Sequence, residues 1–158
     1  MVQAYRVWLP LPDLPPFFGG YELLDDAAGL TVLLQPGIYP NGRKCGTLRL
    51  SFARNAVAYR VHEEFSHPRF GQESGVEASP EWAWGPHPCM VVEGSEWVAG
   101  FLDSQLLEFR RPFVHYFLYT LGNTIDVLAV REPVAAWVET AGLTRQAEPG
   151  AAADNGGT

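Results

Sequence analysis

The sequence predicts a protein of the α+β class, in which antiparallel β-sheet predominates and one or two helices pack on the sheet. Three observations lead to this prediction. Short runs of alternating apolar and polar residues recur between turn-forming clusters. Two β-rich runs are joined by Gly122-Asn123, a typical two-residue hairpin turn. Apolar residues at helical spacing follow only Ser95 and Pro133.

The length and composition indicate one folded unit. A chain of 158 residues with 47% hydrophobic residues can build one sizeable core. Residues 146–158 contain no large apolar side chain, so they cannot bury enough surface to offset the entropy lost on ordering. We therefore expect a single globular domain over residues 1–145 and a disordered tail over residues 146–158.

Four strands are expected in the first part of the chain, after a proline-rich arm over residues 1–20. Residues 21–24 and 30–34 are short strands separated by a turn-like acidic stretch. Residues 47–52 and 56–62 alternate about Arg54-Asn55, which predicts a second hairpin. One face of that hairpin is apolar and the other is polar.

The polar face of this predicted hairpin is a weak candidate for anion binding. A two-residue turn would place Arg49 directly opposite Arg60, with His62 on the same face. Like charges in direct opposition destabilise a sheet unless an anion lies between them. That anion is either a ligand carboxylate or phosphate, or one of the chain's own glutamates.

Residues 63–96 form an acidic, aromatic segment with seven glutamates and one arginine. Its prolines and glycines indicate loops, interrupted by a short strand at Trp82 and Trp84 and another over residues 89–92. The segment suits an exposed surface for a basic protein, in which charge speeds association and aromatic side chains anchor the partner. The candidate binding residues are Glu73, Glu77, Glu81, Trp82 and Trp84. The alternative is a solvated loop whose tryptophans are core anchors.

The last third of the chain begins with a helix that Ser95 can cap and continues with the strongest hairpin of the sequence. The hairpin consists of residues 113–121 and 124–130. Residues 133–141 fit a final helix with Pro133 at its first position, and residues 134–138 fit a strand nearly as well. Both readings stay open.

His115 and Asp126 lie in this hairpin but are not expected to act together. A turn at Gly122-Asn123 places Asp126 opposite Tyr119, which leaves about 13 Å between His115 and Asp126 at ~3.3 Å per residue. They would then share no proton, and we assign no catalytic residue. Asp126 would accept a hydrogen bond from a tyrosine hydroxyl or from solvent.

No metal or cofactor site is expected. His87-Pro88-Cys89 is the only close pair of soft ligands, and the additional ligands that a zinc site needs are missing from the pattern. No phosphate-binding loop, nucleotide-binding fingerprint, nucleophile elbow or HExxH motif is present.

The charge and the N-terminus bear on partners and location. The formal net charge of −7 makes nucleic acid and membranes improbable partners. No signal peptide and no apolar run of membrane-spanning length are found, and the two cysteines lie far apart, so we expect a cytoplasmic protein with free thiols. Lys44 is the only lysine among 11 basic residues, which indicates a GC-rich bacterial genome.

Three hypotheses for function remain. The first is a non-catalytic cytoplasmic binding protein that meets a basic protein partner, in the general manner of an immunity or antitoxin-like protein. The second is a small hydrolase that uses histidines and glutamates brought together by the fold. The third is a small-ligand binder with an aromatic-lined pocket.

Overall fold

The structure, a computed structural model, describes residues 3–37, 45–63, 78–79, 82–101 and 112–139. For residues 78–79 and 82–86 it describes the backbone alone. Its elements follow the chain in this order: β1 (Ala4–Val7), β2 (Phe18–Asp26), β3 (Gly29–Pro36), β4 (Thr47–Ala53), β5 (Ala56–Glu63), β6 (Ala78–Ser79), β7 (Trp82–Pro86), β8 (Cys89–Glu93), α1 (Glu96–Gly100), β9 (Val114–Thr120), β10 (Asn123–Ala129) and β11 (Val134–Val138). In this part of the chain, no helix is long and apolar enough to cross a membrane.

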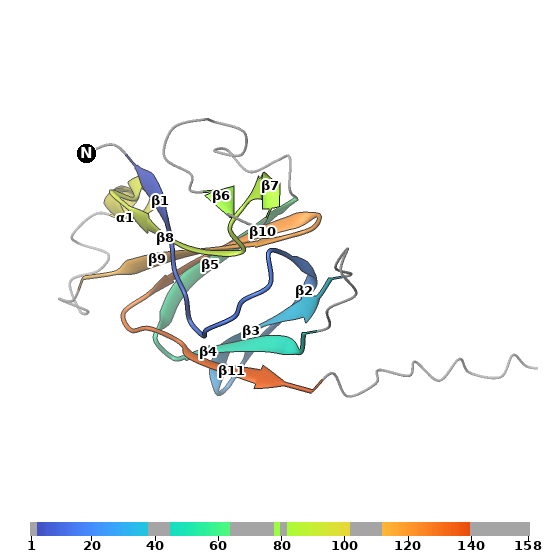
Figure 1. The fold of residues 1–158 in the computed structure, drawn as a ribbon. Coiled ribbons are helices and arrows are strands. Elements are labelled where there is room, and N and C mark those ends of the chain that lie inside the picture. Colours follow the sequence, from blue (N-terminus) through green and yellow to red (C-terminus); the bar gives the residue numbers. More distant parts are fainter. Residues whose placement is uncertain (1–2, 38–44, 64–77, 80–81, 102–111, 140–158) are drawn as a thin grey trace, which may run out of the picture.

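The strands form two layers, with β6 and β7 as a separate pair. A five-stranded sheet has the order β1-β8-β9-β10-β5, and a four-stranded sheet has the order β11-β4-β3-β2. All strand pairs in both sheets are antiparallel. Figure 1 shows the chain crossing between the layers after β1, β4 and β10. The arrangement is a β-sandwich.

The main core lies between the two sheets because each sheet directs alternate apolar side chains toward the other. In β3, Leu30, Val32 and Leu34 are buried while the residues between them are only partly buried. The core combines residues of both sheets: Phe18, Leu30, Val32, Leu34, Leu48, Leu50, Phe52, Cys89, Tyr116, Leu118, Ile125, Val127 and Ala129.

The five-stranded sheet is buried on its outer face as well. A second apolar cluster on that face contains Tyr5, Met90, Val92, Phe117 and Tyr119. These residues alternate along β8 and β9 with residues of the main core. The central strand β9 therefore carries apolar side chains on both faces, as its sequence predicts.

The predominance of antiparallel sheet is confirmed, but the α+β class is not supported, because the part of the chain described contains very little helix. That part contains one helix, α1, of five residues. The segment after Pro133 is the strand β11, paired with β4, and not a helix. Val134 and Trp137 would share one stripe of a helix, but they lie on opposite faces of this strand. Both are exposed.

The predicted hairpin of β4 and β5 does not form. β4 pairs with β3 and β11, whereas β5 pairs with β10 in the other sheet. Ala53, at the end of β4, has a positive φ of 51°, and the chain turns there from one layer to the other. Alternating patterns in two strands are equally compatible with pairing side by side and with facing each other across a core, so the pattern alone does not separate these arrangements.

The hairpin of β9 and β10 forms with a different turn from the one expected. Thr120 pairs with Asn123, so the two turn residues are Leu121 and Gly122. Gly122 takes a φ of +101°, which glycine adopts without the penalty of a side chain. The register consequently places Asp126 opposite Phe117 and not Tyr119.

Candidate functional site

A buried polar network lies on the outer face of the five-stranded sheet. Arg60 of β5 stands directly opposite Asp126 of β10. On its other side, Asp126 stands opposite Phe117 of β9. His115 lies two residues before Phe117 on the same strand, so it is the diagonal neighbour of Asp126. Diagonal residues on one face of a sheet are within reach of long side chains. The predicted register, in which His115 and Asp126 lie too far apart to touch, is therefore wrong.

The network runs in order from Ser95 through His115 to Asp126. His115 Nε2 lies 2.6 Å from Asp126 Oδ1, and His115 Nδ1 lies 2.7 Å from Ser95 Oγ. An ionised carboxylate only accepts hydrogen bonds, so Nε2 donates to Asp126. In the tautomer whose single proton is on Nε2, Nδ1 accepts from the serine hydroxyl. Ser95 Oγ also accepts a hydrogen bond from the backbone N–H of Val98 at 3.1 Å. Ser95 is the N-cap of α1, as its sequence position predicts.

Arg60 and Trp97 complete the network. Arg60 Nε donates to Asp126 Oδ2 at 3.1 Å, so the carboxylate interacts with a cation on the side away from His115. The guanidinium carbon of Arg60 lies 4.3 Å from the ring centroid of Trp97, in cation–π geometry. The Trp97 ring also meets His115 edge-to-face at 5.3 Å. Arg60 and Trp97 thereby connect β5 to α1.

The order Ser95, His115, Asp126 is that of a nucleophile, a general base and an orienting acid. Access to it is narrow: the residue Ser95 is 8% exposed, and the side chains of His115 and Asp126 are 1% and 0% exposed. Ser95 Oγ is further held by its capping bond to Val98. These groups interact mainly with one another and fasten α1 to the sheet.

The predicted anion site is not assembled as the sequence suggests. Arg49 lies on β4 in the four-stranded sheet, opposite Leu33 and Ala136, while Arg60 lies in the other sheet. His62 stays near Arg60 on β5, with Nδ1 3.7 Å from Asp126 Oδ2. Among the described residues, the carboxylate that pairs with Arg60 is Asp126 of the same chain.

All five predicted protein-binding residues fall where the structure gives no side chains. Glu73, Glu77 and Glu81 lie outside the described residues. Trp82 and Trp84 belong to β7, which confirms the short strand expected there. The acidic surface built from these residues stays a prediction.

The close pair of soft ligands, His87 and Cys89, forms a local turn. His87 Nδ1 lies 2.8 Å from the carbonyl oxygen of Cys89, and both residues are buried. Burial raises the pKa of the Cys89 thiol well above its usual range, so the sulfur is protonated at neutral pH. Among the described residues, no three side chains of the metal-binding types converge.

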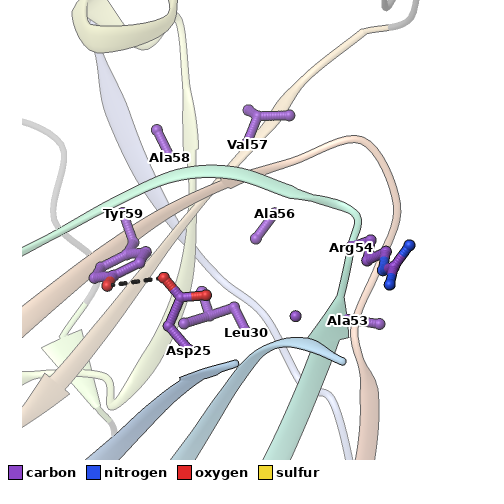
Figure 2. A pocket seen from close by; sticks show the side chains of 9 residues that line it. Asp25, Leu30, Ala53, Arg54, Ala56, Val57, Ala58 and Tyr59 are labelled. Atoms are coloured by element: carbon purple, nitrogen blue, oxygen red, sulfur yellow. Dashed lines mark hydrogen bonds between the residues drawn. The ribbon is translucent and has the colours of Figure 1, made fainter. Parts of the chain in front are cut away.

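An open cleft of about 420 Å³ lies where β5 passes the turn between β2 and β3. Asp25, Gly29 and Leu30 line one side, and residues 53–54 and 56–59 of the β4–β5 corner and of β5 line the other. Figure 2 shows the Tyr59 hydroxyl and the Asp25 carboxylate facing each other across it, joined by a hydrogen bond of 3.2 Å. That bond, with the nearby charge of Asp25, raises the pKa of Tyr59. Tyr59 is the only aromatic residue among the described residues that line the cleft, so the cleft differs from the predicted aromatic-lined pocket.

Sequence reasoning missed both features for a common reason. Ser95, His115 and Asp126 belong to separate segments, and only the turn at Leu121-Gly122 brings the last two together. The cleft depends on β5 leaving the sheet that contains β4. Comparison of the chain with family models, with curated proteins and with solved structures found no match.

Proposed function

We propose that this chain is a non-catalytic binding protein whose partner is a basic protein. The observation that carries the proposal is the exposure of apolar side chains on the inward-facing side of β5. Tyr59 and Val61 are 40% and 37% exposed, although they stand opposite Val127 and Ile125, which are fully buried. Apolar surface at an opening in the core is a typical site for a partner.

The charges support a basic partner. The chain has 18 acids against 11 bases, and the exposed carboxylate of Asp25 lines the cleft. Complementary charge speeds encounter and disfavours acidic competitors. Glu73, Glu77 and Glu81 would add to the same field, which fits the manner of an immunity or antitoxin-like protein.

The proposal is tested by selection from a library of displayed random peptides on the immobilised full chain. We expect the enriched peptides to carry net positive charge, and their association to slow as salt rises from low to physiological strength. Dissociation should change less. Enrichment of neutral or acidic peptides, or no enrichment, would overturn the proposal.

A second candidate function, a small hydrolase, is favoured by the hydrogen-bond order of Ser95, His115 and Asp126. In this reaction Ser95 Oγ attacks an ester carbonyl carbon and its proton passes to His115 Nδ1. His115 then protonates the departing alcohol, and water hydrolyses the acyl group from Ser95. Throughout the reaction, Asp126 accepts a hydrogen bond from the protonated Nε2 of His115 and so orients the ring.

An activated ester separates the two functions. A non-catalytic protein hydrolyses p-nitrophenyl acetate at the same rate before and after Ser95→Ala. Hydrolysis by the unsubstituted chain that disappears in Ser95→Ala and in His115→Ala, but persists in the control Ser51→Ala on β4, would establish the hydrolase instead.

A further inference from the structure

Among the described strands, β5 lies at the edge of its sheet, and its inward-facing side chains are only partly covered. It is the last strand in the order of the five-stranded sheet and pairs with β10. Residues opposite one another in an antiparallel pair share a face, so Tyr59 and Val61 point to the same side as the buried Val127 and Ile125. Their exposure shows that the four-stranded sheet does not close over this edge.

Across the cleft, the nearest edge of the other sheet is β2, and side chains bridge the gap. The Tyr59 hydroxyl reaches Asp25, and the Arg54 guanidinium donates to the carbonyl oxygen of Ala27 at 3.0 Å. In the described part of the chain, β2 pairs with β3 and not with β5. The sandwich is therefore open on this side, between two strand edges.

We propose that the edge of β5 binds an extended segment of the basic partner as an additional antiparallel or parallel strand. The inference rests on the proposed function and names the site and mode of binding. An edge strand directs alternate N–H and C=O groups away from its sheet, and these pair readily with an incoming strand. Tyr59 and Val61 supply the apolar surface for alternate side chains of that strand.

The charges along the inward face of β5 specify the segment. Asp25 lies at the Tyr59 end of this face, and Glu63, two residues beyond Val61 and exposed, lies at the other end. Arg54, the cation among the described residues that line the cleft, donates to Ala27. A fitting strand therefore has apolar residues at two alternate positions and a basic residue at each end of the same face.

A synthetic peptide of sequence Lys-Thr-Val-Thr-Val-Thr-Lys has this pattern, because its lysines and valines share one face of a strand. We expect it to bind the full chain, measured by fluorescence anisotropy, and we expect the peptide with both lysines replaced by glutamate not to bind. N-methylation of alternate backbone amides should abolish binding in one of the two frames and spare it in the other, since only one frame faces β5.

Variants of the chain locate the site. Asp25→Lys should weaken binding of the lysine peptide about tenfold, which corresponds to about 1.4 kcal/mol. Val61→Asp places a carboxylate where the peptide's valines would make apolar contact, and it should weaken peptide binding at least as much. Glu139→Lys, an equal change of charge on an exposed residue beyond β11, should alter binding less than twofold.

The outcomes distinguish the two proposals. Failure of the lysine peptide to bind at millimolar concentration would overturn strand addition at β5. So would equal effects of Asp25→Lys and Glu139→Lys, or loss of binding in both N-methyl frames. If the library still selects basic peptides in any of these cases, the proposed function stands and only this site is refuted.

Discussion

Asp126 is fully buried and connects three strands and a helix through its hydrogen bonds. One oxygen accepts from His115 and the other from Arg60, and His115 in turn holds Ser95. A buried carboxylate is tolerated because these partners replace its hydration. Removal of one member leaves the others desolvated, so the cost of a single substitution exceeds the net contribution of the network.

Asp126→Ala should lower the free energy of unfolding by about 3 kcal/mol, because it leaves His115 and Arg60 without their acceptor. Urea denaturation measures this change. The control Asp25→Ala removes an exposed carboxylate and should cost about 0.5 kcal/mol or less. A cost below about 1 kcal/mol for Asp126→Ala would show that the network contributes little to stability.

Tyr116 makes the stability depend on alkaline pH. Burial in the core, and secondarily the negative charge of Glu132, raises the pKa of its hydroxyl to about 12. The folded state thus holds this proton more tightly than the unfolded state, in which the pKa is about 10. The resulting stabilisation is complete below about pH 10 and is lost as pH rises to about 12.

Tyr116→Phe should remove this dependence, because phenylalanine does not ionise. Denaturation at pH 8 and at pH 11 should show that the stability of the unsubstituted chain falls more than that of the variant. A difference between the two proteins that stays constant over this range would contradict the assignment.

The turns between strands depend on two glycines that share a conformation but differ in their surroundings. Gly29, at the turn between β2 and β3, has φ +102°, and a Cβ built there would lie 2.1 Å from the backbone carbonyl of Ala53. Gly122, at the turn between β9 and β10, has φ +101° with no atom within 4 Å of such a Cβ. Gly29 is therefore needed for the close approach of the β2–β3 turn to the corner after β4.

Gly122→Ala should cost about 1–2 kcal/mol, from the unfavourable positive φ alone. Gly29→Ala should cost at least about 2 kcal/mol more, because the backbone of Ala53 has to move as well. Urea denaturation of both variants gives the comparison. Equal costs would indicate that the β2–β3 turn does not approach the corner after β4 at Ala53 as closely as described.

The two sheets share one core, and neither buries its inner face alone. Residues of β3 and β4 interlock with residues of β9 and β10 in a single cluster. Small domains with one core generally unfold in one cooperative step.

Unfolding should accordingly follow one transition with the same midpoint by far-ultraviolet circular dichroism and by tryptophan fluorescence. Trp97 reports on the five-stranded sheet and Trp137 on the four-stranded sheet. Single-tryptophan variants with different midpoints would show that the sheets unfold separately.

The strand segments follow directly from the sequence, because alternation with period two is a local property of each segment. Residues 30–34, 47–52 and 89–92 are strands in the structure as predicted. The cap at Ser95 is also local, since a serine hydroxyl before a helix accepts from the first turn. β1, at the start of the proline-rich arm, is missed because a strand of four residues is too short for its alternation to stand out.

Tertiary structure decided the partners of the strands. A period of two does not distinguish a strand beside β4 from one that faces it across the core, so only packing of the complete chain placed β5 next to β10. In the same way, a turn shifted by one residue, at Leu121-Gly122, reduced the separation of His115 and Asp126 along the strands from about 13 Å to about 6.6 Å. Their side chains span this distance and form a hydrogen bond of 2.6 Å. The polar network and the open edge of β5 both follow from these pairings, which depend on contacts between distant segments and not on the residues of any one of them.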